Sequence, residues 1–195
     1  MNTAEKIRDI FYSGNYAFSG ESEPINEIAF LVDEEYLSLA SSVIADKQEY
    51  LRVAQEISER AHMFDAAAGG GHSHMALKII AQRFLRKQRN KEAIFEHPFC
   101  GYYPDVISID KTIVVECGHT QNPTKMLDYF QEGNILEYIQ VPYPTVDDQS
   151  VTGFIFTAGS ALSEFLTFLN EQKRNKVREI VRRRKQPKKG AQIDL

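Results

Sequence analysis

The spacing of hydrophobic residues changes along the chain, and the first third has the helical pattern. Apolar residues between positions 26 and 64 recur at mixed intervals of three and four, which predicts more than one helix. Glycines at positions 69–71 interrupt this pattern. An amphipathic segment at 73–90, basic at its C-terminal end, then predicts another helix. We therefore expect a helical N-terminal region over residues 1–69.

After residue 91 the pattern becomes that of β-strands. Segments rich in β-branched and aromatic residues occur at 92–99, 103–109, 112–118, 137–143 and 152–158. Segment 122–133 has proline near its start and glycine at its end, as helices do, and 160–186 predicts a long closing helix. We expect an α/β fold with a mixed β-sheet flanked by helices. Its core spans 70–160, and a basic C-terminal helix and tail at 161–195 pack on the same domain.

Composition narrows the class of protein. The 195 residues suit one domain, and no apolar run is long enough to cross a bilayer. The first residues lack the pattern of a signal peptide, and two cysteines make no disulfide framework, so we expect a cytoplasmic protein without a membrane partner. From Lys173 onward there are ten basic residues against two acidic ones, although the net charge is −4. Such a tail either meets a polyanion or forms salt bridges with its own acidic body.

Two carboxylates stand out in the stretch 104–120, within otherwise apolar strands. If Asp110 and Lys111 form a two-residue turn, Ile107 faces Val114 and Asp105 faces Glu116. Like charges in direct opposition are destabilising, so one carboxylate would take a proton unless a cation neutralised the pair. Mg²⁺ or Mn²⁺ is the cation that we expect. One alternative is a register shifted by one residue, which would put the two acids on opposite faces of the sheet. Another is that each acid caps a neighbouring loop.

The order of these residues resembles the PD-(D/E)XK nuclease superfamily, which has the restriction-endonuclease-like fold. Pro104-Asp105 followed by "VVECG" matches its short motif, and the outline extends over about residues 70–160. The resemblance implies that Asp105 and Glu116 bind divalent ions, which activate water for attack on a phosphodiester. The motif lysine would stand at Gly118, so His119 or Lys125 is expected to replace it as a catalytic residue.

Other polar residues extend this candidate site. Glu96 is a candidate third metal ligand, the alternative being a solvent-facing side chain at the rim of a strand. His74 is expected to line the cleft and touch phosphate, or else to be a surface residue beside a helix cap. The candidate nucleic-acid-binding arginines of the tail are Arg174, Arg178, Arg182, Arg183 and Arg184.

Two main functions remain open from the sequence. The first is a metal-dependent endonuclease or phosphodiesterase, a hydrolase that cuts DNA or RNA. The second is an inactive protein of the same fold that binds nucleic acid or a protein partner, a reading that the missing lysine favours. A homodimer, or a structural subunit that docks through its tail, is a further alternative.

Overall fold

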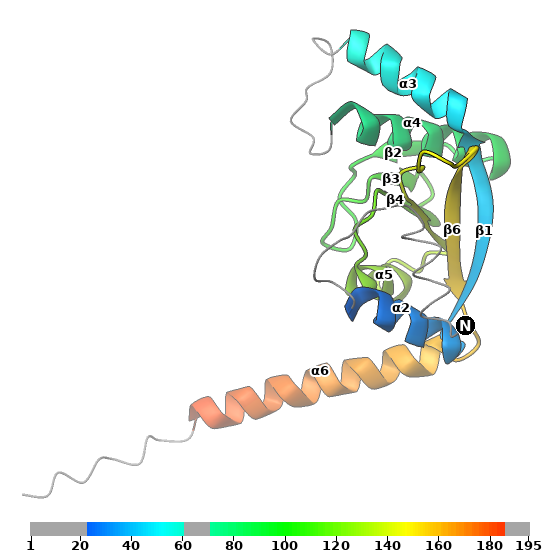
Figure 1. Ribbon diagram of the computed structural model, residues 1–195. Helices are drawn as coiled ribbons and strands as arrows, with labels where there is room; N and C mark the ends of the chain where they lie inside the picture. The colour runs from blue at the N-terminus through cyan, green and yellow to red at the C-terminus, as the bar shows by residue number, and fades with distance from the viewer. Residues whose placement is uncertain (1–22, 61–70, 186–195) are drawn as a thin grey trace, which may run out of the picture.

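The computed structural model describes residues 23–60 and 71–185, and these form an α/β structure. The described strands make a six-stranded mixed sheet in the order β1-β6-β5-β4-β3-β2 (Figure 1). In chain order the described elements are α2 (Glu23–Asp33), β1 (Leu37–Asp46), α3 (Lys47–Glu59), α4 (Gly71–Gln88), β2 (Ala93–Phe95), β3 (Val106–Ser108), β4 (Ile113–Cys117), α5 (Pro123–Gln131), β5 (Glu137–Val141), β6 (Ser150–Ala158) and α6 (Leu162–Lys185).

Helices cover both faces of the sheet. Residues of α3 and α4 pack with Val106, Ile113 and Val115 in one core, whereas residues of α2, α5 and the start of α6 pack with Ile107 and Val114 in the other. Because both faces of the central strands are buried, these strands are apolar at almost every position. The prediction of a mixed sheet flanked by helices is confirmed.

The prediction of a helical N-terminal region is wrong for one segment. Residues 37–46 were expected to be helical but form β1, which pairs antiparallel with β6 along nine residue pairs. Ser41, Ser42 and the β-branched Val43 and Ile44 weaken the helical tendency, and the long-range pairing with β6 decides the conformation. Residues 1–22 and 61–70 of this region lie outside the described residues.

The β3–β4 hairpin has the predicted register but a different turn. Val106 pairs with Val115 and Ile107 with Val114, as expected. The prediction of a two-residue turn is wrong. The backbone N–H of Lys111 donates to the carbonyl of Ser108, and the loop is longer than two residues. The Ser108 side chain accepts from the backbone N–H groups of Thr112 and Ile113, which satisfies the polar groups inside this loop.

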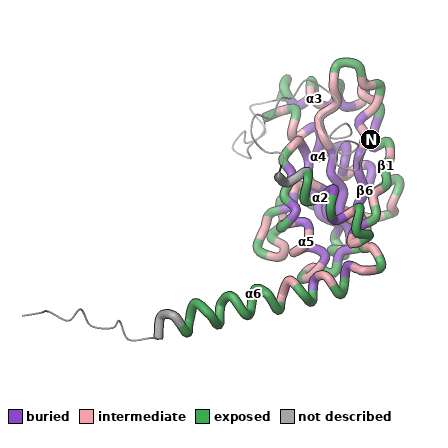
Figure 2. Tube along the Cα trace, turned by 60° about the horizontal axis from the view of Figure 1, so that its bottom comes forward, coloured by how far each residue is buried: buried purple, intermediate pink, exposed green. Residues whose placement is uncertain are grey.

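Only the beginning of α6 packs on the body. Leu162 and Leu166 are buried in the core beside α2 and α5, whereas every described side chain from 171 to 182 is exposed (Figure 2). The rest of the helix projects away from the sheet and its covering helices (Figure 1). Beyond these buried leucines, Lys173 Nζ lies 3.7 Å from Asp128 Oδ1 of α5. Within the described ranges no helix has the length and apolar character needed to cross a membrane.

Candidate functional site

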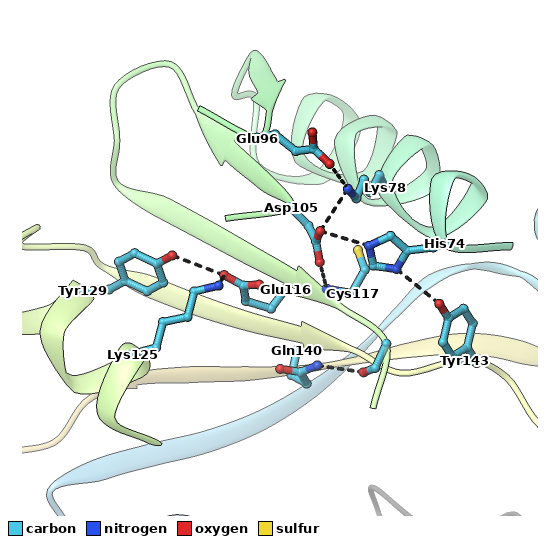
Figure 3. A network of polar contacts seen from close by, with 11 residues as sticks. His74, Lys78, Glu96, Asp105, Glu116, Cys117, Lys125, Tyr129, Gln140 and Tyr143 are labelled. Carbon is cyan, nitrogen blue, oxygen red and sulfur yellow. Dashed lines mark hydrogen bonds and ion pairs between the residues drawn. The ribbon is translucent and has the colours of Figure 1, made fainter. Parts of the chain in front are cut away.

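The Asp105 carboxylate lies just before β3 and is held mainly by α4. His74 Nε2 and Lys78 Nζ each lie 3.0 Å from Asp105 Oδ1 (Figure 3). The two side chains reach the same carboxylate because residues four apart lie on one face of a helix. The backbone N–H of Cys117 donates to Asp105 Oδ2 at 2.7 Å. Asp105 thus connects α4 to strand β4.

These contacts favour the ionised form of Asp105. Burial alone would raise the pKa of this carboxyl group, but the hydrogen bonds from His74 and Cys117 and the charges of His74 and Lys78 hold it below its usual value. His74 is itself oriented from its other nitrogen, because Nδ1 lies 3.2 Å from the hydroxyl group of Tyr143. Asp105 is therefore a fixed, negatively charged group at the end of the sheet.

Lys78 is the most deeply buried charged group of the site. Its residue surface is 2% exposed, and its Nζ lies 2.5 Å from Glu96 Oε1 in addition to its contact with Asp105. Burial would lower the pKa of this lysine, but the hydrogen bonds and charges of the two carboxylates raise it above its usual value. Lys78 consequently carries a positive charge between two acids.

The Glu116 carboxylate is held from the opposite helical layer. Lys125 Nζ of α5 lies 2.7 Å from Glu116 Oε1, and the Tyr129 hydroxyl group donates to the same oxygen at 3.3 Å. Pro123 begins α5, and the Asn122 side chain caps it by accepting the Lys125 backbone N–H. The start of α5 thereby directs Lys125 toward the strand (Figure 3).

Burial has a different outcome at Glu116 than at Asp105. It raises the pKa of Glu116 from its usual 4.5 to about 7, although Lys125 opposes the shift; the nearby charge of Asp105 adds to the rise. The pKa values of these two neighbouring carboxyl groups therefore shift in opposite directions. That of Asp105 lies below its usual value and that of Glu116 lies above it. Such a divergence at one site is typical of groups with a functional role.

The raised pKa of Glu116 predicts how the stability of the protein depends on pH in metal-free buffer. Because its pKa is higher in the folded state, the folded form binds the proton more tightly, and stability falls as the pH rises from 4.5 through about 7. Between pH 4.5 and 8 the wild type should lose about 2–3 kcal/mol that Glu116→Gln does not lose, measured by urea unfolding with EDTA.

Asp110→Asn is the control for this measurement. The pKa of Asp110 is lowered by its hydrogen bonds, which outweigh burial, so its contribution to stability disappears at acidic pH below this window. This variant should follow the wild-type slope between pH 4.5 and 8. Parallel curves for the wild type and Glu116→Gln would contradict the assignment.

Each acid has its own lysine, and the two lysines come from helices on opposite faces of the sheet. Lys78 of α4 pairs with Asp105, and Lys125 of α5 pairs with Glu116. The Lys125 side chain extends from α5 toward Glu116. Gly118 has a φ of 97°. A residue with a side chain would be strained in this conformation.

The other predicted residues lie in different places. His119 packs near Tyr143, with 5.2 Å between ring centroids, and burial lowers its pKa. Glu96 contacts Lys78, and no three His, Cys, Asp or Glu side chains in the described part of the chain form a group that could hold a metal ion. Arg174, Arg178 and Arg182 are exposed residues of α6, the helix that projects away from the sheet (Figure 1). Arg183 and Arg184 belong to α6, but their side chains are not described.

Sequence reasoning missed Lys78, Tyr129 and Tyr143. A signal was present for Lys78, since it interrupts an apolar run in α4 and stands four residues after His74. Tyr129 likewise follows Lys125 by four residues in α5. Nothing in the local sequence marks Tyr143, whose hydroxyl group meets His74 from beyond the end of β5.

The side chains available as metal ligands suit some metals better than others. Zinc sites usually take three or four protein ligands, which the described residues do not bring together. Mg²⁺ keeps several waters and is commonly bound through one or two carboxylates and substrate phosphates. Asp105, just before β3, and Glu116 of β4 each offer carboxylate oxygens, the kind of ligand that Mg²⁺ and Mn²⁺ accept.

Comparisons with known proteins add no assignment to this geometry. No family model matches the chain, and neither the curated proteins nor the solved structures gave a significant match. The function is therefore argued from the site itself.

Proposed function

We propose that the protein is a metal-dependent nuclease-like hydrolase that cleaves phosphodiester bonds of DNA or RNA. One observation carries the proposal. Lys125 Nζ lies 2.7 Å from Glu116 Oε1, so a lysine stands beside the second acid although the motif position is Gly118. A paired set of acids and a nearby lysine is the combination that the PD-(D/E)XK resemblance requires. The order of elements supports the same reading, since α4 precedes the sheet, β2 precedes the hairpin and α5 follows it.

The proposed roles follow from the contacts. Asp105 and Glu116 would hold Mg²⁺ or Mn²⁺, which when bound lowers the pKa of a coordinated water and neutralises charge on the phosphate. His74 and the Cys117 N–H fix the Asp105 carboxylate in one orientation. Lys125, set by the capped start of α5, supplies a positive charge for the phosphate, and Lys78 keeps Asp105 ionised.

The test is cleavage of labelled single- and double-stranded DNA and RNA. We expect cleavage with Mg²⁺ or Mn²⁺, none with EDTA, and recovery when the metal is returned in excess. Asp110→Asn is the matched control, because it removes a carboxylate at the far end of the same hairpin and should retain activity. Cleavage that is insensitive to EDTA, or absent from all four substrates with both metals, would contradict the proposal.

The exposed arginines of α6 should contribute affinity without sequence preference. Replacing Arg174, Arg178 and Arg182 with alanine removes three charges from the projecting helix. If these side chains contact phosphates, the slope of log affinity against log salt should fall by up to about 0.9 for each contact with duplex DNA. Fluorescence anisotropy at several salt concentrations measures this slope. An unchanged slope would show that these three arginines do not contact the phosphates of the nucleic acid.

A second candidate is a nucleic-acid-binding protein without catalytic activity. The observation in its favour is that Lys78 and Lys125 already neutralise Asp105 and Glu116. A site balanced in this way can exist without a cation. Nucleic-acid binding with no cleavage by any combination of substrate and metal would favour this candidate over the hydrolase.

A further inference from the structure

The two edges of the sheet are protected very differently. At one edge, β2 has three residues and is flanked by the charged side chains of Lys91, Glu92 and Glu96. At the other edge, β1 has ten residues, and within the described part of the chain it pairs with β6 alone. Figure 1 shows β1 along the outer side of the sheet. The segment 37–45 contains no charged residue, proline or glycine.

Such an edge is unusual, because the outward backbone N–H and C=O groups of an edge strand can pair with a strand of another chain. Proteins normally protect an edge by keeping it short or by placing charges, proline or a bulge on it. The edge at β2 has the first two protections. The only irregularity of β1 lies between Val43 and Ala45, and Leu37–Val43 pair with β6 in one unbroken register. Seven residues thus form a regular edge whose outward N–H and C=O groups suit another strand.

The side chains along β1 would not obstruct such a strand. Ser38, Ala40 and Ser41 are exposed and small, and Val43 is 57% exposed. They lie on both faces of the strand, because successive side chains alternate. No charge along 37–45 would repel an identical strand or select a charged partner. An uncharged strand of small residues is compatible with its own copy.

We propose that β1 pairs antiparallel with β1 of a second copy of this chain, so that one sheet continues through a two-fold dimer. Two-fold symmetry makes a strand antiparallel to its copy. A register centred on Ala40 places the exposed Val43 of one copy opposite Leu37 of the other, a leucine that is buried in its own core. It also places Ser38 opposite Ser42, a pair able to exchange hydroxyl hydrogen bonds. This dimer does not depend on the proposed hydrolase activity.

The first test is the mass of the full chain by sedimentation equilibrium over a wide range of concentrations. The wild type should approach twice the 22.3 kDa of one chain. Ser41→Lys should weaken the dimer about tenfold or more, because it places like charges on the shared edge. Ser58→Lys adds the same charge at an exposed position of α3 and should leave the mass unchanged. A monomeric wild type would overturn the proposal.

A second variant detects the dimer through a covalent crosslink, so the test does not depend on dissociation of the dimer. Ala40→Cys should form a disulfide-linked dimer under mild oxidation, because the register places the two thiols opposite each other. Ser58→Cys controls for chance encounters and for the native cysteines, Cys100 and Cys117. A wild-type dimer that Ser41→Lys leaves intact, with no crosslink through position 40, would place the interface elsewhere and overturn the proposal.

Discussion

Replacing Lys125 with methionine is expected to slow phosphodiester cleavage about 10²–10³-fold, the usual effect of removing one group that stabilises charge in a transition state. The methionine keeps much of the side-chain length and loses the ammonium group that lies 2.7 Å from Glu116. Divalent-metal affinity should be unchanged or tighter, because a positive charge has left the neighbourhood of a proposed ligand. Single-turnover cleavage and a metal titration measure the two effects separately.

Lys111→Met is the control for Lys125→Met. Lys111 is an exposed lysine in the hairpin loop, at the other end of β3 and β4 from the acids. Its replacement removes the same charge and should leave the cleavage rate within a factor of a few. If Lys125→Met cleaves as fast as Lys111→Met, Lys125 is not the replacement for the motif lysine.

Lys78→Met is expected to lower the free energy of unfolding by about 3–5 kcal/mol in metal-free buffer, because removing one partner of a buried pair leaves a buried charge uncompensated. Lys78 is 2% exposed and lies against the partly buried Asp105, whereas its other partner, Glu96, has a side chain that is 44% exposed. Added Mn²⁺ should restore more stability to this variant than to the wild type, since the cation can neutralise Asp105. Urea unfolding with EDTA and with Mn²⁺ measures both quantities.

Lys91→Met provides the comparison for this experiment. Lys91 pairs with Asp110, and both side chains are more than one-third exposed, so their separation should change stability by no more than about 1 kcal/mol. Equal losses in Lys78→Met and Lys91→Met would contradict the structural role of Lys78. A loss that Mn²⁺ does not reduce would separate Asp105 from metal binding.

Local patterns predicted most of the fold. The strands after residue 91 and helix α5 follow from β-branched runs and from Pro123 and Gly133 at the helix limits. The register of the β3–β4 hairpin was predictable because its two strands are close in sequence. Strand β1 was not, since its conformation depends on β6, which lies more than a hundred residues further along the chain.

The contact between Lys125 and Glu116 could be anticipated from the sequence, whereas that between Lys78 and Asp105 could not. Lys125 follows Glu116 closely, so a helix starting at Pro123 brings it within reach. Lys78 meets Asp105 through the packing of α4 against the sheet, and sequence spacing alone does not determine that contact. The missing information was three-dimensional, because the hairpin sequence does not reveal which helices cover the ends of its strands.

Calorimetric titration with Mn²⁺ tests most directly whether Asp105 and Glu116 act as one metal site. The wild type and Asp110→Asn should bind Mn²⁺ with the same affinity, whereas Asp105→Asn and Glu116→Gln should each lose the binding heat. Both losses are expected because the proposed site takes one carboxylate from each of these residues. Binding that persists in both Asp105→Asn and Glu116→Gln, or no binding in the wild type, would contradict the account.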